Sequence, residues 1–301
     1  MGRHTRWQAI LTITGIAMTM AFLGFLAFSR TTITVPDVSG TYTEGIAGTP
    51  QYINPLLAHY NPVDQDLSAL IFNGLTRPDG KGGLEPDLAK SWQVSDDGLT
   101  YLFKLRADVR WQDNEPFTAA DVLFTINLMK DPEFPGVPYL GDLWRSVTVE
   151  KIDEHTIRFI LPEPFPSFAD FTTIGILPAH LLADLPARDL LSHPFNLNPV
   201  GTGPFKLDEV NAEFAQLSAN PLYPGPKPRL PHLKLRFYAS YQEVVAAYQA
   251  GDVQGVSFVP PQAIPTVKNI ETLNLYTARL SRYNIIYFNL QAPESALFFQ
   301  E

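Results

Sequence analysis

The side chains most often used for metal binding and catalysis are few in this chain, and their spacing fits no metal site. The six His residues stand at positions 4, 59, 155, 180, 193 and 232, whereas the paired His ligands of zinc enzymes recur within a few residues of each other. The chain has no Cys, which excludes disulfides, thiol nucleophiles and Cys-ligated zinc or iron–sulfur clusters. We therefore expect no metal site.

Motifs for nucleotide binding and for hydrolysis are also absent from the sequence. It contains no phosphate-binding loop, no HExxH pair and no GxSxG turn. The segment Gly201-Thr202-Gly203 looks like the start of a dinucleotide loop, but Pro204 follows it. Proline removes a backbone donor, and the third glycine of that loop is missing. The chain is thus expected not to be an enzyme and to need no cofactor.

Two acids near the start of an expected helix, Asp64 and Asp66, resemble the first ligands of a calcium loop. The Gly and the terminal Glu that complete such a loop are not present. We interpret both acids as a solvated helix start.

The charge of the chain argues against a nucleic-acid partner. It holds 22 basic and 31 acidic residues, for a net charge of −9. The first 30 residues contain three Arg and no acids, so the remainder is more acidic still. A body of this charge lacks the basic face that phosphate contacts require.

The N-terminus predicts export from the cytoplasm. Residues 7–28 are uncharged and follow Arg3 and Arg6. At about 1.5 Å per residue in a helix, such a stretch is long enough to cross a bilayer, and preceding positive charge keeps the N-terminus inside. Residues 1–30 are expected to be an uncleaved membrane anchor or a signal peptide cut near Ser29, and residues 31–45 a linker.

Alternating apolar residues and turn signals predict two β-hairpins in the body. Residues 91–94 and 99–105 flank an Asp-Gly turn, and residues 147–149 and 155–161 flank a turn at 153–154. Between them, Thr118 should cap a helix that Asp121 supports and that ends at Asp131-Pro132. Further segments complete an irregular α/β order: helices over 64–72 and 241–250, the latter ending at Gly251, and strands over 205–207, 233–237 and 283–290.

The stretch from Leu84 to Asp131 resembles the bacterial extracellular solute-binding proteins of family 5, the peptide and nickel class of ABC importers. Later landmarks follow in the same order, and two upstream segments fit the entry to the fold. The matching segments are LEPDLAKSW (84–92), SDDGLTY (95–101), FKLR (103–106), VRW (109–111), PFTAADV (116–122), NPVGTGPF (198–205), YQAGD (248–252), FNL (288–290), INP (53–55) and FNGL (72–75).

The resemblance implies an α/β fold of the type II periplasmic binding protein kind, with two lobes and a hairpin-rich subdomain on the first. On this basis, residues 46–77 and 196–280 form a discontinuous first lobe, and residues 78–195 are inserted into it. Relatives are about twice as long, so residues 281–301 would begin a second lobe that is largely missing, and the chain would be a fragment or a truncated reading frame.

The resemblance also implies where ligand binds. The loop after Asn54-Pro55 lies along bound peptide in relatives, and two later segments border the cleft. The implied ligand-binding residues are His59, Tyr60, Asn61, Val63, Phe258, Val259, Tyr283 and Asn284.

The expected function is that of an extracytoplasmic substrate-binding component of an ABC importer. It would capture a peptide or another small solute between its lobes, act as a monomer and deliver the ligand to a membrane permease. The alternative is a membrane-anchored sensor or interaction protein that reuses the N-terminal lobe.

Overall fold

The computed structural model describes residues 14–23 and 40–277. They belong to two units, one ending at Phe258 and the other beginning at Val259. Residues 14–23 are helical. Within the parts of the chain that the structure describes, no helix combines the length and hydrophobicity that a membrane span requires. Most of the expected anchor, and the strand expected over 283–290, lie outside the described residues.

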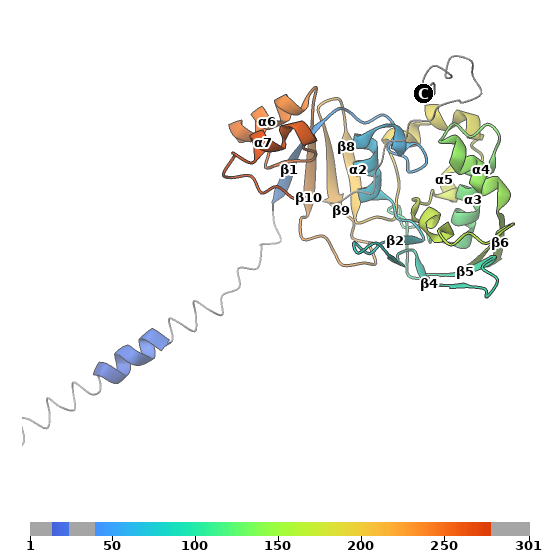
Figure 1. The fold of residues 1–301 in the computed structure, drawn as a ribbon, viewed down its shortest axis with the longest axis horizontal. Helices are drawn as coiled ribbons and strands as arrows, with labels where there is room; N and C mark the ends of the chain where they lie inside the picture. The colour runs from blue at the N-terminus through green and yellow to red at the C-terminus, as the bar shows by residue number, and fades with distance from the viewer. Residues whose placement is uncertain (1–13, 24–39, 278–301) are drawn as a thin grey trace, which may run out of the picture. The chain divides into compact units, whose positions relative to one another are not determined.

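The largest sheet of the described residues has five strands and lies in the first unit (Figure 1). Its order is β11-β1-β10-β9-β8, with β1 parallel to β10 and β11 and the other pairs antiparallel. Because β1 starts at Thr41, residues 41–45 of the expected linker are part of this sheet. The strands are β1 (Thr41–Ala47), β8 (Phe205–Val210), β9 (Phe214–Ala219), β10 (His232–Tyr238) and β11 (Gly255–Val256).

Helix α6 (Tyr241–Ala250) lies on one face of this sheet, and strand alternation buries the other face. Leu233, Leu235 and Phe237 of β10 alternate into that other face and are buried, as the sequence predicts. On β1, a Cβ at Gly45 would lie only 2.7 Å from a methyl of Val244, so α6 approaches the strand where there is no side chain. The helix ends at Gly251 in the left-handed conformation (φ 82°), which confirms the predicted stop.

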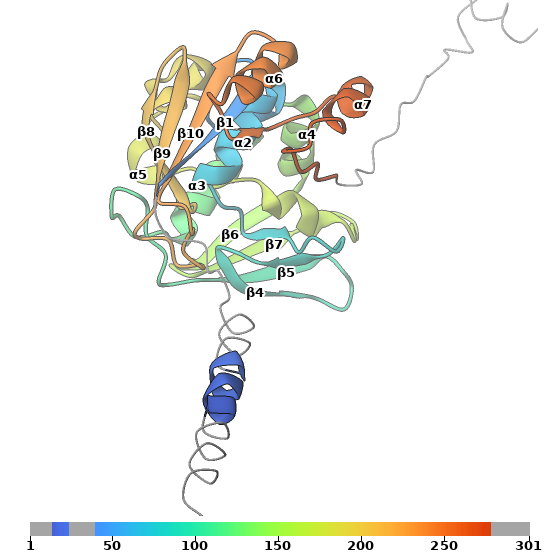
Figure 2. The same ribbon diagram turned by 90° about the vertical axis from the view of Figure 1, so that its left-hand side faces the viewer.

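The two predicted hairpins pair into a separate antiparallel sheet of order β4-β5-β7-β6, and Figure 2 shows helix α3 above it. Tyr101, Phe103 and Leu105 point to its buried face. Phe159 packs edge-on against Phe103, with 5.5 Å between ring centroids. The strands are β4 (Ala89–Val94), β5 (Thr100–Leu105), β6 (Thr148–Asp153) and β7 (Thr156–Ile160).

Helix α3 (Ala119–Lys130) covers this sheet and begins where the sequence predicts. The Thr118 hydroxyl accepts from Ala120 N, and Asp121 accepts from Thr118 N at 2.8 Å, which completes a capping box. Further elements, including the two-stranded sheet β2-β3, belong to the two units. They are η1 (Ala58–Tyr60), α2 (Pro62–Ile71), β2 (Thr76–Pro78), β3 (Leu84–Pro86), α4 (Pro138–Ser146), η2 (Phe168–Thr173), α5 (Ala179–Leu182), η3 (Ala187–Ser192) and η4 (Pro194–Leu197), with η5 (Pro261–Ala263) and α7 (Ile264–Val267) in the second unit.

Helix α2 corrects the interpretation of its two acids. Asp66 is exposed, but Asp64 is completely buried. The Asp64 carboxylate accepts hydrogen bonds from Gln51 N (2.8 Å) and Tyr52 N (2.9 Å). Its role is therefore to tie the preceding loop to the helix, so the interpretation as a solvated acid was wrong for Asp64, whereas it holds for the exposed Asp66.

Candidate functional site

The loop between β1 and α2, which the resemblance placed beside ligand, is held by buried amides. Asn54 is completely buried; its Nδ2 donates to Asn196 Oδ1 and its Oδ1 accepts from Leu56 N, each at 3.0 Å. Ile53 N also donates to Asn196 O at 2.8 Å. The loop therefore takes a defined path before it reaches the predicted site residues.

His59 and Tyr60 lie together in the short helix η1. Their ring centroids are 4.0 Å apart, and the Tyr60 hydroxyl donates to Pro135 O at 3.2 Å. Tyr60 is 56% exposed, whereas His59 is half-buried. Burial lowers the pKa of the His59 imidazole, so this ring is neutral at neutral pH.

Asn61 and Val63 form the start of α2. The Asn61 side chain caps the helix by accepting from Val63 N (3.0 Å), and its Nδ2 donates to Thr49 O (2.7 Å). Val63 is buried in the hydrophobic core. Both side chains thus have structural contacts, and their contact with ligand stays a prediction.

Of the other four predicted ligand residues, one belongs to the first unit, one to the second unit, and two lie outside the described residues. Phe258 is 68% exposed at the end of the first unit. Val259 belongs to the second unit and is half-buried. Tyr283 and Asn284 lie outside the described residues.

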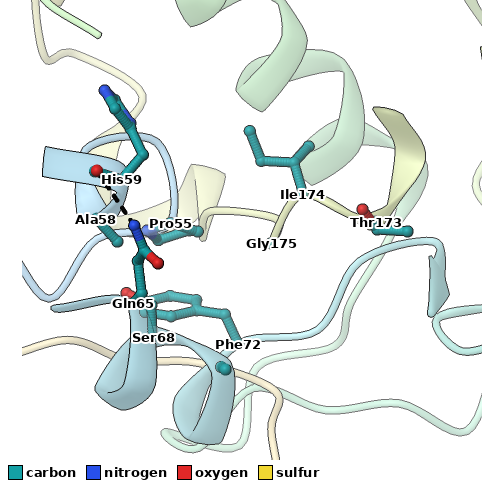
Figure 3. A pocket seen from close by; sticks show the side chains of 10 residues that line it. Pro55, Ala58, His59, Gln65, Ser68, Phe72, Thr173, Ile174 and Gly175 are labelled. Atoms are coloured by element: carbon teal, nitrogen blue, oxygen red, sulfur yellow. Dashed lines mark hydrogen bonds between the residues drawn. The ribbon is translucent and has the colours of Figure 1, made fainter. Parts of the chain in front are cut away.

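A pocket of about 250 Å³ opens next to η1, between α2 and the segment that follows η2 (Figure 3). Of the predicted ligand residues that the structure describes, only His59 lines it. The described residues of the lining are Pro55, Ala58, His59, Gln65, Ser68, Ala69, Phe72, Thr173, Ile174 and Gly175.

The walls of this pocket are joined by backbone contacts at its base. Leu75 N donates to Thr172 O at 2.8 Å, and Ile176 N donates to Asn73 O at 3.0 Å. At Gly74, a Cβ would lie 2.5 Å from Thr173 O, so the two segments approach each other without an intervening side chain. These contacts make the pocket a preformed feature of the fold.

The lining of the pocket mixes polar and apolar side chains, and among the described residues it contains no carboxylate, ammonium or guanidinium group. Phe72, Ile174 and Pro55 provide apolar surface. Among the polar groups, Gln65 Nε2 donates to His59 O at 3.1 Å (Figure 3). Ser68 Oγ and His59 Nε2 are buried and have no hydrogen-bond partner among the described residues. The site can therefore hold an uncharged group and offers it hydrogen bonds.

Sequence reasoning missed Ser68 and Phe72, although the pattern contained a signal for them. Gln65, Ser68, Ala69 and Phe72 follow the i, i+3, i+4, i+7 spacing of a single helix face. Mixed polar and small residues on such a face are unusual for a core-facing stripe. The opposite wall, residues 173–175, is close only through the fold and had no local signal.

Elsewhere in the described residues, no group of three or more His, Asp or Glu side chains is arranged to hold a metal ion. A second, smaller pocket of about 70 Å³ includes Arg77, Asp87 and Arg106. Its guanidinium groups already pair with carboxylates: Arg77 with Glu85 at 2.7 Å, and Arg106 with Asp108 at 2.9 Å.

Comparison with known sequences identifies the relatives of the chain. A family model described as bacterial extracellular solute-binding proteins, family 5 Middle, matches residues 83–299. A Brucella ovis protein named as an ABC transporter peptide-binding protein is 32% identical over 90% of this chain and 51% of its own length. The oligopeptide-binding protein AppA of Bacillus subtilis is 28% identical over 84% of this chain and 47% of its own length. The chain thus spans about half the length of the curated relatives it matches.

Solved structures give the same result for the fold. NikZ from Campylobacter jejuni, in complex with Ni(L-His), superposes with a TM-score of 0.69 and 31% identity, covering 79% of this chain and 46% of NikZ. AppA from Bacillus subtilis, in complex with a nonapeptide, has a TM-score of 0.69 and 27% identity, covering 77% of this chain and 46% of AppA.

Proposed function

Since the chain belongs to family 5 of the bacterial extracellular solute-binding proteins, we propose that it is the substrate-binding component of an ABC importer for peptides or similar small solutes. The family match over residues 83–299 carries this proposal. Relatives named as peptide-binding proteins of ABC transporters support the substrate class. On this proposal the protein binds and releases its ligand and catalyses no reaction.

The proposed mechanism is capture of ligand in a cleft between two lobes. Residues 46–77 and 196–280 supply the first lobe, residues 78–195 are its inserted subdomain, and residues 281–301 begin the second lobe. Ligand that contacts both lobes stabilises the closed state because it binds that state more tightly than the open one. The closed, loaded protein then delivers its ligand to a membrane permease.

The loop at His59 and Tyr60 and the neighbouring pocket are the proposed contribution of the first lobe to ligand binding. A peptide needs backbone hydrogen bonds along its length and pockets for its side chains. The loop offers backbone groups, and the pocket next to it has room for a side chain of about benzene size or more.

The proposed site of action is outside the cytoplasmic membrane, where the protein acts as a monomer. Arg3 and Arg6 before an uncharged stretch support export. The N-terminal segment then either tethers the body to the membrane or is removed as a signal peptide.

A ligand screen on the protein purified from its source cells tests the proposal. The panel contains dipeptides, a nonapeptide and Ni(L-His), and the readout is the thermal unfolding temperature. A ligand at about 100 times its Kd adds about 2.7 kcal/mol of stability, so at least one class should raise the unfolding temperature by several degrees. If no class changes it, the proposal for this substrate range is wrong.

A further inference from the structure

The pocket between α2 and residues 173–175 contains a hydroxyl with an unusual environment. Ser68 is only 6% exposed, and its Oγ has no partner among the described residues. A serine inside a helix commonly donates to the carbonyl one turn earlier, and that bond is not made here. A buried hydroxyl without a partner destabilises the folded state, so its presence at a pocket wall points to a ligand that would bond to it.

The polar groups next to Ser68 also favour a ligand that forms hydrogen bonds in this pocket. Gln65 uses its amide nitrogen to bond His59 O, and Figure 3 shows the side chain lying beside the pocket between His59 and Phe72. Its carbonyl oxygen can therefore accept from a ligand, while the Ser68 hydroxyl can donate or accept. Together they match a group that carries both a donor and an acceptor.

Among the described residues, the lining offers no opposite charge to an ionised group. None of the ten lining residues is Asp, Glu, Lys or Arg, and the one titratable side chain, His59, is kept neutral by burial. An ion that entered would lose its hydration without gaining an opposite charge, which is costly. Phe72, Ile174 and Pro55 would instead favour an apolar body behind the polar end.

We propose that this pocket is a specificity subsite for an uncharged side chain or similar group with an apolar body and an amide or hydroxyl end, which Ser68 binds directly. The proposal rests on the binding function proposed above and adds the chemical class accepted at one position of the ligand. It predicts that ligands with a carboxylate or ammonium at this position are rejected.

Three probes with the same branched carbon body test the subsite: isobutyramide, isobutyrate and isobutylammonium. Each is titrated into the ¹⁵N-labelled 301-residue chain, and the backbone amide signals of Ser68, Ala69 and Gly175 are followed. Isobutyramide should shift these signals saturably, and the two ions should bind at least about tenfold more weakly. Equal binding of either ion, or no shift with any probe, would overturn the proposal.

A pair of variants assigns the contact to the hydroxyl. Ser68→Ala should weaken isobutyramide binding by about 3- to 10-fold, since it removes the hydrogen bond. Ser146→Ala is the matched control, because its hydroxyl donates to Leu143 O at the exposed end of α4, and its binding should equal that of the unmodified chain. Unchanged binding by a folded Ser68→Ala variant would contradict direct contact.

The outcome of this titration is separable from that of the importer proposal. If the protein from source cells captures a ligand but no probe binds this pocket, the importer proposal stands and the subsite proposal is wrong. Selective probe binding without capture of any peptide or nickel ligand would retain the subsite and reject the proposed substrate range.

Discussion

Asp64, Asn54 and Ser68 are buried polar side chains on or beside α2, and they differ in whether they have hydrogen-bond partners. Asp64 accepts two backbone N–H groups, and Asn54 exchanges hydrogen bonds with Asn196 and Leu56. Ser68 has no partner among the described residues. The first two organise the loop next to the pocket, whereas the third is free to contact ligand. Buried polar groups with hydrogen-bond partners, such as Asp64 and Asn54, stabilise the fold. The Ser68 hydroxyl instead carries the ligand specificity that we propose.

The buried carboxylate of Asp64 gives a prediction about stability. Asp64→Ala leaves Gln51 N and Tyr52 N without their acceptor, and an unsatisfied buried donor costs about 1–3 kcal/mol. The free energy of unfolding, from urea denaturation, should fall by at least that amount. Asp66→Ala is the matched control on the exposed side of the same helix and should change it by less than about 0.5 kcal/mol. Equal effects of the two substitutions would show that the loop does not depend on Asp64.

Substitution of Ser68 is predicted to raise the free energy of unfolding, whereas substitution of Asp64 lowers it. Ser68→Ala removes an unpartnered hydroxyl and introduces the residue with the highest helix propensity, so α2 should gain about 0.5 kcal/mol. The measurement is the urea midpoint of the chain without ligand. A clear loss of stability would mean that the hydroxyl has a structural partner in solution, which would remove the basis for its role in binding.

At the scale of elements, the sequence predicted much of the fold where the signal was local. Both hairpins, the Thr118 cap and the Gly251 stop depend on residues within one turn or one strand pair, and all are confirmed. The burial of Asp64 was missed because it depends on a loop 12 and 13 residues away in sequence. The far wall of the pocket was missed for the same reason, since residues 173–175 reach α2 only through tertiary packing.

The capping box of α3 can be tested directly. Thr118→Ala removes the hydroxyl that accepts from Ala120 N, and loss of an N-cap typically costs about 0.5–2 kcal/mol. Thermal or urea unfolding should show this loss, and Thr118→Ser should restore most of the stability because it retains the hydroxyl. A Thr118→Ser variant as unstable as Thr118→Ala would assign the effect to the lost methyl group.

The turn at Gly201 presents a second test at this scale. A Cβ there would lie 1.9 Å from Ile71 O at the end of α2, so Gly201→Ala must displace the turn or the helix. Overpacking of this kind costs about 1–3 kcal/mol, measurable as a lower urea midpoint. Gly141→Ala is the control, because a Cβ there would meet the flexible end of Arg145 at 3.0 Å and Met129 O at 3.3 Å, contacts that a small shift relieves. A neutral Gly201→Ala would contradict the close approach.

At the scale of the whole molecule, the family assignment from the sequence is confirmed, and so is the α/β fold of the type II periplasmic binding proteins. This was possible because landmarks spread along the chain keep their order, even where single residues have no evident role. The domain boundaries and the eight ligand-binding residues stay predictions. Tyr283 and Asn284 lie outside the described residues, and residue type alone did not indicate the pocket.

The central claim is that this protein delivers a small solute to an importer, and uptake by living cells tests it most directly. Source cells with and without the gene would be given labelled dipeptides, a labelled nonapeptide and nickel with histidine, and accumulation would be measured over time. The account predicts that deletion abolishes accumulation of one solute class and that the unmodified gene restores it. Unchanged accumulation of every solute in the deleted strain would contradict it, and a ligand-binding protein without uptake would favour a sensor.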